Sequence, residues 1–182
     1  MEYLKTTASS LSVYVGDLSQ NYANFRAAAQ STNLTVVETQ KLFKQVAQAG
    51  RVFGLANDDI SGTFRALMQM MSKGAVQMEE LRQQFGDRLP GAMGAAARAM
   101  GVTTAKLFDM VKNKEITGSK MESFMKNLGN ELEKMTQGGL SSALDTVSAK
   151  MASLHNTYNE MAVGLGKAGL NEAFGLLISS LN

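Results

Sequence analysis

The sequence is short of several residue types, and each shortage limits what the protein can be. It has no cysteine, which excludes disulfides, thiolate metal sites and cysteine nucleophiles and suits a reducing compartment. It has no tryptophan and a single proline, so long stretches are free of the residue that breaks helices. Only 19% of its 182 residues are charged and 45% are hydrophobic, which is typical of a folded chain. This length is enough for one well-buried domain, with or without extensions.

No charged face or long apolar run points to nucleic acid or to a membrane. The formal net charge is +2, and the basic residues are scattered among acidic ones, so no face for nucleic acid or anionic lipid stands out. Met1 to Lys5 lack the basic region and apolar run of a secretory signal. The most apolar stretch, 170–181, falls short of the roughly 18 residues that a membrane-spanning helix needs.

The residues that are present favour an all-α fold. Thirteen methionines supply flexible, unbranched side chains for a helical core, and no segment alternates polar and apolar residues for long enough to form a sheet. We expect a compact multi-helix domain of short helices, flanked by two longer helices that carry heptads. The predicted parts are an N-terminal heptad helix over 1–34, a central helical domain over 35–137, and a C-terminal heptad helix with a helical tail over 138–182.

Both end segments carry apolar residues at alternating spacings of four and three, the pattern of a coiled-coil seam. The N-terminal set is Leu4, Ala8, Leu11, Val15, Leu18, Tyr22, Phe25 and Ala29. The C-terminal set is Leu140, Leu144, Val147, Met151, Leu154, Tyr158, Met161 and Leu165. The register breaks at Gly166 and Gly169 and resumes through Leu170, Phe174, Leu177 and Leu181. Either the two seams pack together as an antiparallel hairpin that closes the domain, or they associate with other copies of the chain.

Start and stop signals divide the central region into about six helices. The signals are capping boxes at Thr35 with Glu38 and at Ser119 with Glu122, an N-cap at Asn57 and a left-handed C-cap at Gly74. A short helix over 78–85 is expected to end at Gly86. Pro90 is then expected in the first turn of an alanine-rich helix, whose thin profile predicts a place in the middle of the core.

No set of reactive side chains predicts an enzyme, a cofactor site or a metal site. The segment 164–169 has the glycine spacing of a dinucleotide-binding turn, but a heptad helix precedes it where that turn needs a strand, so a helix break is predicted. His155 is the only histidine and lies outside the seam, which favours a solvated helix residue. The pairs Asp58-Asp59 and Glu79-Glu80 do not converge, because adjacent helical residues point about 100° apart.

One polar block, from Ser72 to Ala92, is the candidate for a structural or partner-binding motif. It contains Ser-Lys-Gly, then Glu-Glu-Leu-Arg, then Gly-Asp-Arg-Leu-Pro-Gly-Ala. The candidate residues are Gly74, Glu79, Glu80, Leu81, Arg82, Gly86, Arg88, Leu89, Pro90 and Gly91. Arg82, Asp87 and Arg88 are interpreted either as an ion-paired loop that holds two helices in register, the preferred interpretation, or as a surface that a partner reads.

This block resembles the tape measure domain of long-tailed bacteriophages and prophages, in which the same elements occur in the same order. Ala96 to Leu107 resembles the next stretch of that family, and a lysine-rich turn over 112–116 follows, so the resemblance runs from about Thr35 to Met135. It implies a structural virion protein that lies in the lumen of the tail tube, sets tail length and is made in the host cytoplasm. It also implies the tail-tube protein, tail assembly chaperones and tail-tip proteins as partners.

The length of the chain bears on that implied role. A fully helical chain of this size reaches only about 270 Å at about 1.5 Å per residue, less than a typical tail, so we expect a fragment of a longer ruler or a truncated prophage remnant. An alternative function is a membrane-active or partner-docking helical module used during genome ejection, the only stage at which membrane contact is expected.

Overall fold

The computed structural model describes the backbone of residues 2–167 and the side chains of residues 2–146 and 149–164. Over this range the chain forms nine α-helices and one π-helix, η1, and the sole β-pairing is an isolated bridge between Ala75 and Thr117. The helices are α1 (Glu2–Leu11), α2 (Val15–Ala29), α3 (Val36–Val52), α4 (Asn57–Lys73), η1 (Glu79–Gly86), α5 (Ala92–Ala99), α6 (Thr104–Lys112), α7 (Gly118–Thr136), α8 (Leu140–Leu144) and α9 (Val147–Lys167). The all-α prediction is therefore confirmed.

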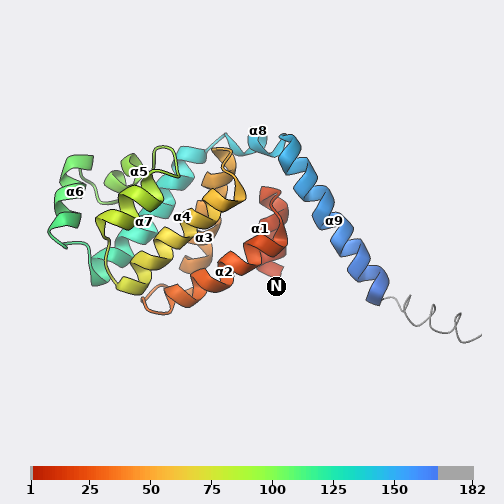
Figure 1. The fold of residues 1–182 in the computed structure, drawn as a ribbon, viewed down its shortest axis with the longest axis horizontal. Coiled ribbons are helices and arrows are strands. Elements are labelled where there is room, and N and C mark those ends of the chain that lie inside the picture. Colours follow the sequence, from red (N-terminus) through yellow and green to blue (C-terminus); the bar gives the residue numbers. More distant parts are fainter. Residues whose placement is uncertain (1, 168–182) are drawn as a thin grey trace, which may run out of the picture.

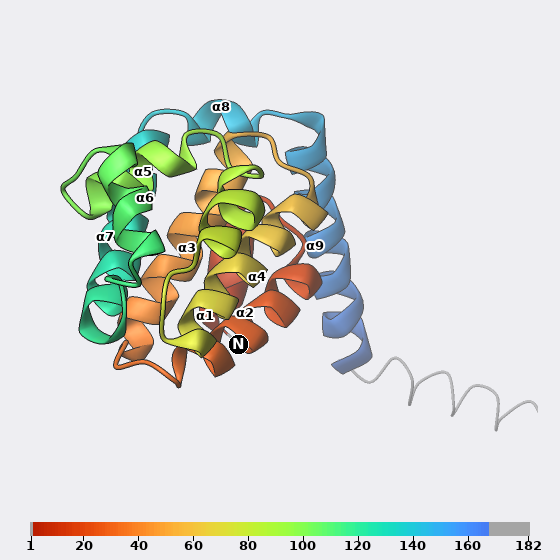
Figure 2. The same cartoon turned by 60° about the vertical axis from the view of Figure 1, so that its left-hand side comes forward.

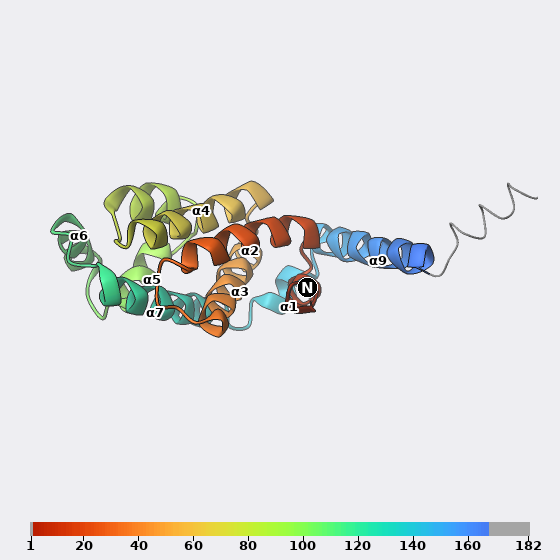
Figure 3. The same cartoon turned by 90° about the horizontal axis from the view of Figure 1, so that it is seen from below.

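The helices pack in two layers, with α2, α4 and η1 in one and α3, α5 and α7 in the other (Figure 3). Aromatic side chains from α2, α3 and α4 fill the space between the layers. The rings of Phe43 and Phe64 stack with their centroids 4.3 Å apart, and Phe25 lies 5.6 Å from both. Helices α6 and α9 lie at opposite ends of the molecule (Figure 1).

The N-terminal heptad segment is two helices, so the prediction of one long helix is wrong. Ser12 has φ 48°, a left-handed conformation that ends α1, and α2 begins at Val15. The apolar periodicity nevertheless identifies buried residues. The buried members of the predicted seam are Leu4, Ala8, Leu11, Leu18, Tyr22, Phe25 and Ala29. A straight helix of this length would extend about 40 Å and leave the core, whereas the break keeps both halves on it.

One of the two predicted capping boxes forms. The Thr35 hydroxyl accepts the backbone N–H of Glu38 at 3.2 Å, and the Glu38 carboxylate accepts the N–H of Thr35 at 2.8 Å. The prediction for Ser119 and Glu122 is wrong, because α7 begins at Gly118 and both residues lie within it. The Glu122 carboxylate instead accepts the backbone N–H of Asn33 at 2.9 Å. A contact distant in sequence has replaced the local cap.

The N-cap predicted at Asn57 and the first-turn position predicted for Pro90 are also wrong. Ala56 occupies the N-cap position of α4, and the Asn57 amide donates to the Asp17 carboxylate at 3.0 Å. Pro90 precedes α5 by two residues, and Gly91, with φ 75°, occupies the N-cap position. The alanines of α5 are buried as expected, on α7, but the aromatic cluster lies on other helices.

The C-terminal heptad segment also breaks, between α8 and α9. Thr146 stands immediately before α9, and its hydroxyl accepts the backbone N–H of Ala149 at 3.2 Å, as an N-cap does. Helix α9 then runs beside α1 and α2 (Figure 2) and contacts the domain through Ala149, Ala152 and Asn156. The two seams do not pack together, so the hairpin between them is wrong. The continuation predicted over 170–181 lies outside the described residues.

Candidate functional site

The polar block folds into a turn, a π-helix and a second turn between α4 and α5. Gly74 ends α4 with φ 63°, in the left-handed conformation predicted for it. The backbone N–H of Val76 then donates to the Ile116 carbonyl at 3.0 Å, which ties the segment to the loop before α7. The short helix predicted over 78–85 is present as η1, but it is a π-helix, whose backbone hydrogen bonds span five residues where those of an α-helix span four. π-Helices are rare in proteins, and those that occur are often found at functional sites. This geometry therefore supports the choice of the block as the candidate site.

The inward face of η1 carries one buried acid among apolar side chains. Glu80 is 1% exposed, and Leu81 on the same face is fully buried. The Glu80 Oε1 atom pairs with the ammonium of Lys73, which lies in the last turn of α4. Its Oε2 atom is buried without a hydrogen-bond partner among the described residues. Glu80 therefore joins η1 to α4 inside the fold, where no partner protein reaches it.

Arg88 joins the end of the block to the middle of α4. Its Nη1 donates to the Gln84 carbonyl at 2.7 Å. Its guanidinium lies against Gly62 so closely that a Cβ at that position would be 2.3 Å from the Arg88 Nε. Leu89 next to it is fully buried. Glycine at position 62 is thus required for this contact, which sequence reasoning missed because its signal is a single glycine within a helical pattern.

The ion-paired loop predicted for Arg82, Asp87 and Arg88 does not form. None of the three makes a salt bridge within the part of the chain that the structure describes. The Arg82 guanidinium instead lies 6.0 Å from the centre of the Phe108 ring on α6, in cation–π geometry. The block still fixes neighbouring helices, but through packing, one cation–π contact and the pair of Lys73 with Glu80.

Two further glycines of the block make room for methionines. A Cβ at Gly86 would lie 2.9 Å from the terminal methyl of Met93, and one at Gly91 would lie 2.6 Å from that of Met135. The exposed residues of the block are Ser72, Lys73, Gln77, Glu79, Arg82, Gln83, Asp87, Pro90 and Gly91. These outward residues are the only portion of the candidate motif, within the described chain, that a partner reaches without unfolding it.

A second polar feature joins α3 to α7 and was not predicted. The Gln45 amide donates to the Glu133 carboxylate at 2.7 Å, and the Gln48 amide donates to the Thr136 hydroxyl at 3.0 Å. Lys126 on α7 pairs with Glu38 at 2.8 Å. Hydrogen bonds from Lys126 and from Thr35 lower the pKa of Glu38 to about 2. The signal in the sequence was a row of polar residues along the edge of the apolar stripe of α3.

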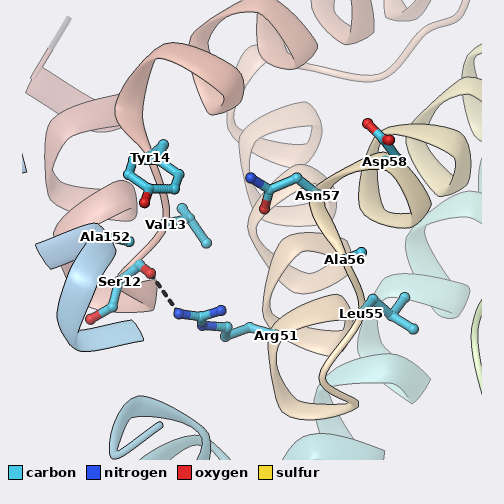
Figure 4. A pocket seen from close by; sticks show the side chains of 9 residues that line it. All are labelled: Ser12, Val13, Tyr14, Arg51, Leu55, Ala56, Asn57, Asp58 and Ala152. Atoms are coloured by element: carbon cyan, nitrogen blue, oxygen red, sulfur yellow. Dashed lines mark hydrogen bonds between the residues drawn. The ribbon is translucent and has the colours of Figure 1, made fainter. Parts of the chain in front are cut away.

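A small cavity of about 300 Å³ lies where the turn between α1 and α2, the loop before α4, and α9 meet (Figure 4). Arg51 reaches into it, and its Nη2 donates to the Ser12 carbonyl at 2.8 Å. The Arg51 Nε is buried without a partner among the described residues, and burial lowers the pKa of this guanidinium. Tyr14 and Asn57 face each other across the opening (Figure 4). This hydrogen bond ties the α1–α2 turn to α3.

The structure places the remaining candidates apart from one another. His155 is exposed on α9, as predicted, and its ring lies 5.0 Å from that of Tyr14. Over the residues described, no group of three His, Asp or Glu side chains is arranged to hold a metal ion. No helix in that range combines the length and apolar character needed to cross a membrane.

The fold and the polar block define an α-helical structural module whose motif is used mainly for internal packing. The chain belongs to the tape measure protein family, because the family model for tape measure protein matches residues 1–167. The family is one of structural components of the phage tail. The chain is also similar, with 33% identity over 184 residues, to a probable tape measure protein of Salmonella phage Felix O1 (isolate Felix O1-VT1).

That alignment covers 91% of this chain but 25% of the relative, so the chain spans about a quarter of the length of the curated protein that it matches. No solved structure matches the chain.

Proposed function

We propose that the chain is a structural helical module of a tape measure protein that sets tail length and organises the assembly of the tail tube. The observation that carries this proposal is the family match over residues 1–167. The candidate site supports a structural role, because Glu80, Leu81 and Leu89 of the polar block are buried and pack against neighbouring helices. In this proposal the module works without catalysis and without a cofactor.

The proposed location is the lumen of the tail tube, and the host cytoplasm during assembly. The proposed partners are the tail-tube protein, tail assembly chaperones and tail-tip proteins. The outward side chains Glu79, Arg82 and Asp87 are the part of the polar block that such a partner would contact. Self-association is a further candidate, and the burial of the N-terminal heptad residues leaves the seam of α9 as its surface in the described chain.

The test is tail length, measured by electron microscopy after in-frame deletion of residues 139–166 from the full-length gene. A helix advances about 1.5 Å per residue, so losing about 28 residues shortens tails by roughly 40 Å if this segment lies extended in the ruler. The control replaces the segment with an unrelated helical sequence of equal length and is expected to keep tail length. Unchanged tails after the deletion would contradict a ruler role for this segment.

A further inference from the structure

Helices α8 and α9 meet at an angle (Figure 1), although no residue between them requires a helix to end. Neither glycine nor proline occurs between residues 140 and 163. Asp145, which follows α8, has φ −78° and ψ −5° and so lies in the right-handed helical region. A small change of backbone torsion angles at this point would therefore make α8 and α9 continuous.

The apolar pattern runs through the bend without a change of register. Spacings of four and three alternate through Leu140, Leu144, Val147, Met151, Leu154, Tyr158 and Met161. Residues with this period lie along one side of a single helix. In the bent form the α9 members of the row are exposed, from 54% for Met151 to 69% for Tyr158. The sequence thus carries the pattern of one helix where the structure has two.

The Thr146 side chain holds the bend by replacing two backbone hydrogen bonds of an unbroken helix. Its hydroxyl donates to the Ala143 carbonyl at 3.0 Å and accepts the backbone N–H of Ala149 at 3.2 Å. In an unbroken helix, the Ala143 carbonyl would accept the backbone N–H of Val147 instead. The Ala149 N–H would donate to the Asp145 carbonyl. Straightening therefore exchanges hydrogen bonds at this point and leaves neither backbone group unpaired.

The attachment of α9 to the domain is the second element that holds the bend. Ala149 and Ala152 are buried, but alanine side chains bury little apolar surface. The Asn156 amide makes two hydrogen bonds to the α1–α2 turn, at 2.7 Å and 3.2 Å. A helix held by two small apolar contacts and one amide is held weakly, and its release costs the domain little of its core.

We propose that the α8–α9 joint is a conformational switch between two states. One is the bent form, with α9 beside α1 and α2, and the other is a straight form in which residues 140–163 make a single helix and α9 leaves the domain. The straight helix is about 36 Å long, at about 1.5 Å per residue, and aligns the exposed row of α9 with Leu144. Thr146 and Asn156 hold the bent form. The switch concerns this chain alone and does not depend on the proposed role in the tail.

Distances between two spin labels test the switch in the full 182-residue chain. Because the chain has no cysteine, nitroxide labels attach only at introduced cysteines. The labelled pair is Thr6→Cys on α1 with Met161→Cys on α9, both at exposed positions. Pulsed electron paramagnetic resonance measures the distribution of distances between the labels. With no further change, one short distance is expected, because α9 runs beside α1 in the bent form (Figure 2).

Two variants of the labelled chain both carry Asn156→Ala, which releases α9, and differ only at position 146. With Thr146→Ala the helix is free to continue, so the distance is expected to lengthen by roughly 10 Å or more and to remain narrow. Met161 lies about 22 Å along the helix from the joint, which gives this lever its length. With Thr146→Pro an unbroken helix is blocked, so the released helix is expected to give a broad distribution.

Thr146→Ser, with Asn156 intact, keeps the hydroxyl and is the matched control, expected to retain the short distance. Broad distributions in both double variants would overturn the proposal, because α9 would be loose and not continuous with α8. A short distance kept after Asn156→Ala with Thr146→Ala would overturn it as well, since these residues would not hold the bend. A long, narrow distance in the Thr146→Pro variant would also overturn it, because the change would not arise at the joint.

Discussion

At the scale of single residues, the polar block shows that a residue in a polar stretch of sequence can be buried in the fold. Glu80 looks like half of an exposed acidic pair, since it stands beside Glu79 in a polar helix. The wider turn of η1 directs Glu80 inward to Lys73 and leaves Glu79 in solvent. The cost of burying a carboxylate is offset only while its counter-ion remains. The stability of the block thus depends on a lysine that is itself 43% exposed.

Replacement of Lys73 by Met is expected to destabilise the protein more than replacement of Glu80 by Gln. Lys73→Met leaves a buried carboxylate without its counter-ion, which costs about 2 kcal/mol. Glu80→Gln removes the charge, keeps the shape and costs less than about 1 kcal/mol. Urea unfolding measures both. Lys120→Met, at an exposed lysine that forms no salt bridge with any described residue, is the control and is expected to change little. Equal losses for the two block variants would contradict this reasoning.

Gly129 is a second residue of this kind, because its lack of a side chain lets α7 pack closely against α3. A Cβ at this position of α7 would lie 2.1 Å from the Gln45 Oε1 and 3.0 Å from the Leu42 Cδ1, both on α3. Alanine usually stabilises a helix interior by about 1 kcal/mol over glycine, but here the crowding is expected to produce a net loss of about 1–3 kcal/mol. Thermal and urea unfolding of Gly129→Ala measure it. The matched control is Gly94→Ala, where only the flexible Arg98 side chain lies nearby, at 3.3 Å, and a small gain is expected.

At the scale of helices, the pair α3 and α7 is joined by a polar edge as well as by an apolar face. Glu38 has a double role in it, because its carboxylate completes the cap of α3 and also binds Lys126 of α7. Both contacts require the charged form of the carboxylate. The attachment of α7 to the start of α3 is therefore sensitive to acid.

The pH dependence of stability follows from the pKa of Glu38, which falls from 4.5 to about 2 in the folded protein. Since the pKa is lower in the folded state, this stabilisation is fully present above pH 4.5 and is lost as the pH falls toward about 2. Glu38→Gln is expected to lower the free energy of unfolding at neutral pH and to flatten its decline in this acid window. Urea unfolding across the window measures the slope. A variant with the same slope as the parent chain would show that Glu38 does not contribute.

At the scale of the whole molecule, α9 is attached to the domain by a few specific contacts. The Asn156 amide donates to the Val13 carbonyl at 2.7 Å and accepts the backbone N–H of Val15 at 3.2 Å. It thereby bridges the break between α1 and α2. Lys5 and Glu160 approach to 3.8 Å, but both are exposed, so that pair adds little. Asn156 thus supplies the polar contacts that fix α9 beside the domain, next to the packing of Ala149 and Ala152.

Asn156→Ala is expected to release α9 while the domain remains folded. Both hydrogen bonds to the α1–α2 turn are lost, so the amides of residues 149–164 are expected to exchange hydrogen faster, with little change in α3 and α7. Hydrogen exchange followed by mass spectrometry resolves the two regions. Thr157→Ala, which alters only an exposed hydroxyl on the same helix, serves as the control. Faster exchange throughout the chain would mean that Asn156 supports the core instead.

Sequence reasoning identified the fold class and most of the core, because burial follows the apolar periodicity wherever the chain is helical. The predicted N-terminal seam residues are buried except for Val15, which is half-buried, although the helix that carries them is broken at Ser12. The errors lie where a tertiary contact replaces a local one, as when Glu122 binds Asn33 instead of its own helix start. The apolar periodicity also did not show which of the two heptad seams would be buried in the domain. That depends on which helices lie next to each seam in the folded chain.

The two-layer packing changes how residue number relates to physical length. In an extended helix every inserted residue adds about 1.5 Å, whereas an insertion in a surface turn of a compact domain adds bulk and leaves the distance between its ends nearly constant. Insertions and deletions between, for example, α5 and α6 would thus be nearly neutral for the reach of the molecule. Insertions and deletions within an extended helix would change the length of the molecule in proportion to the number of residues. Under the proposed ruler role, selection on tail length would leave this domain free to vary in size while holding the extended helical parts to a fixed residue count.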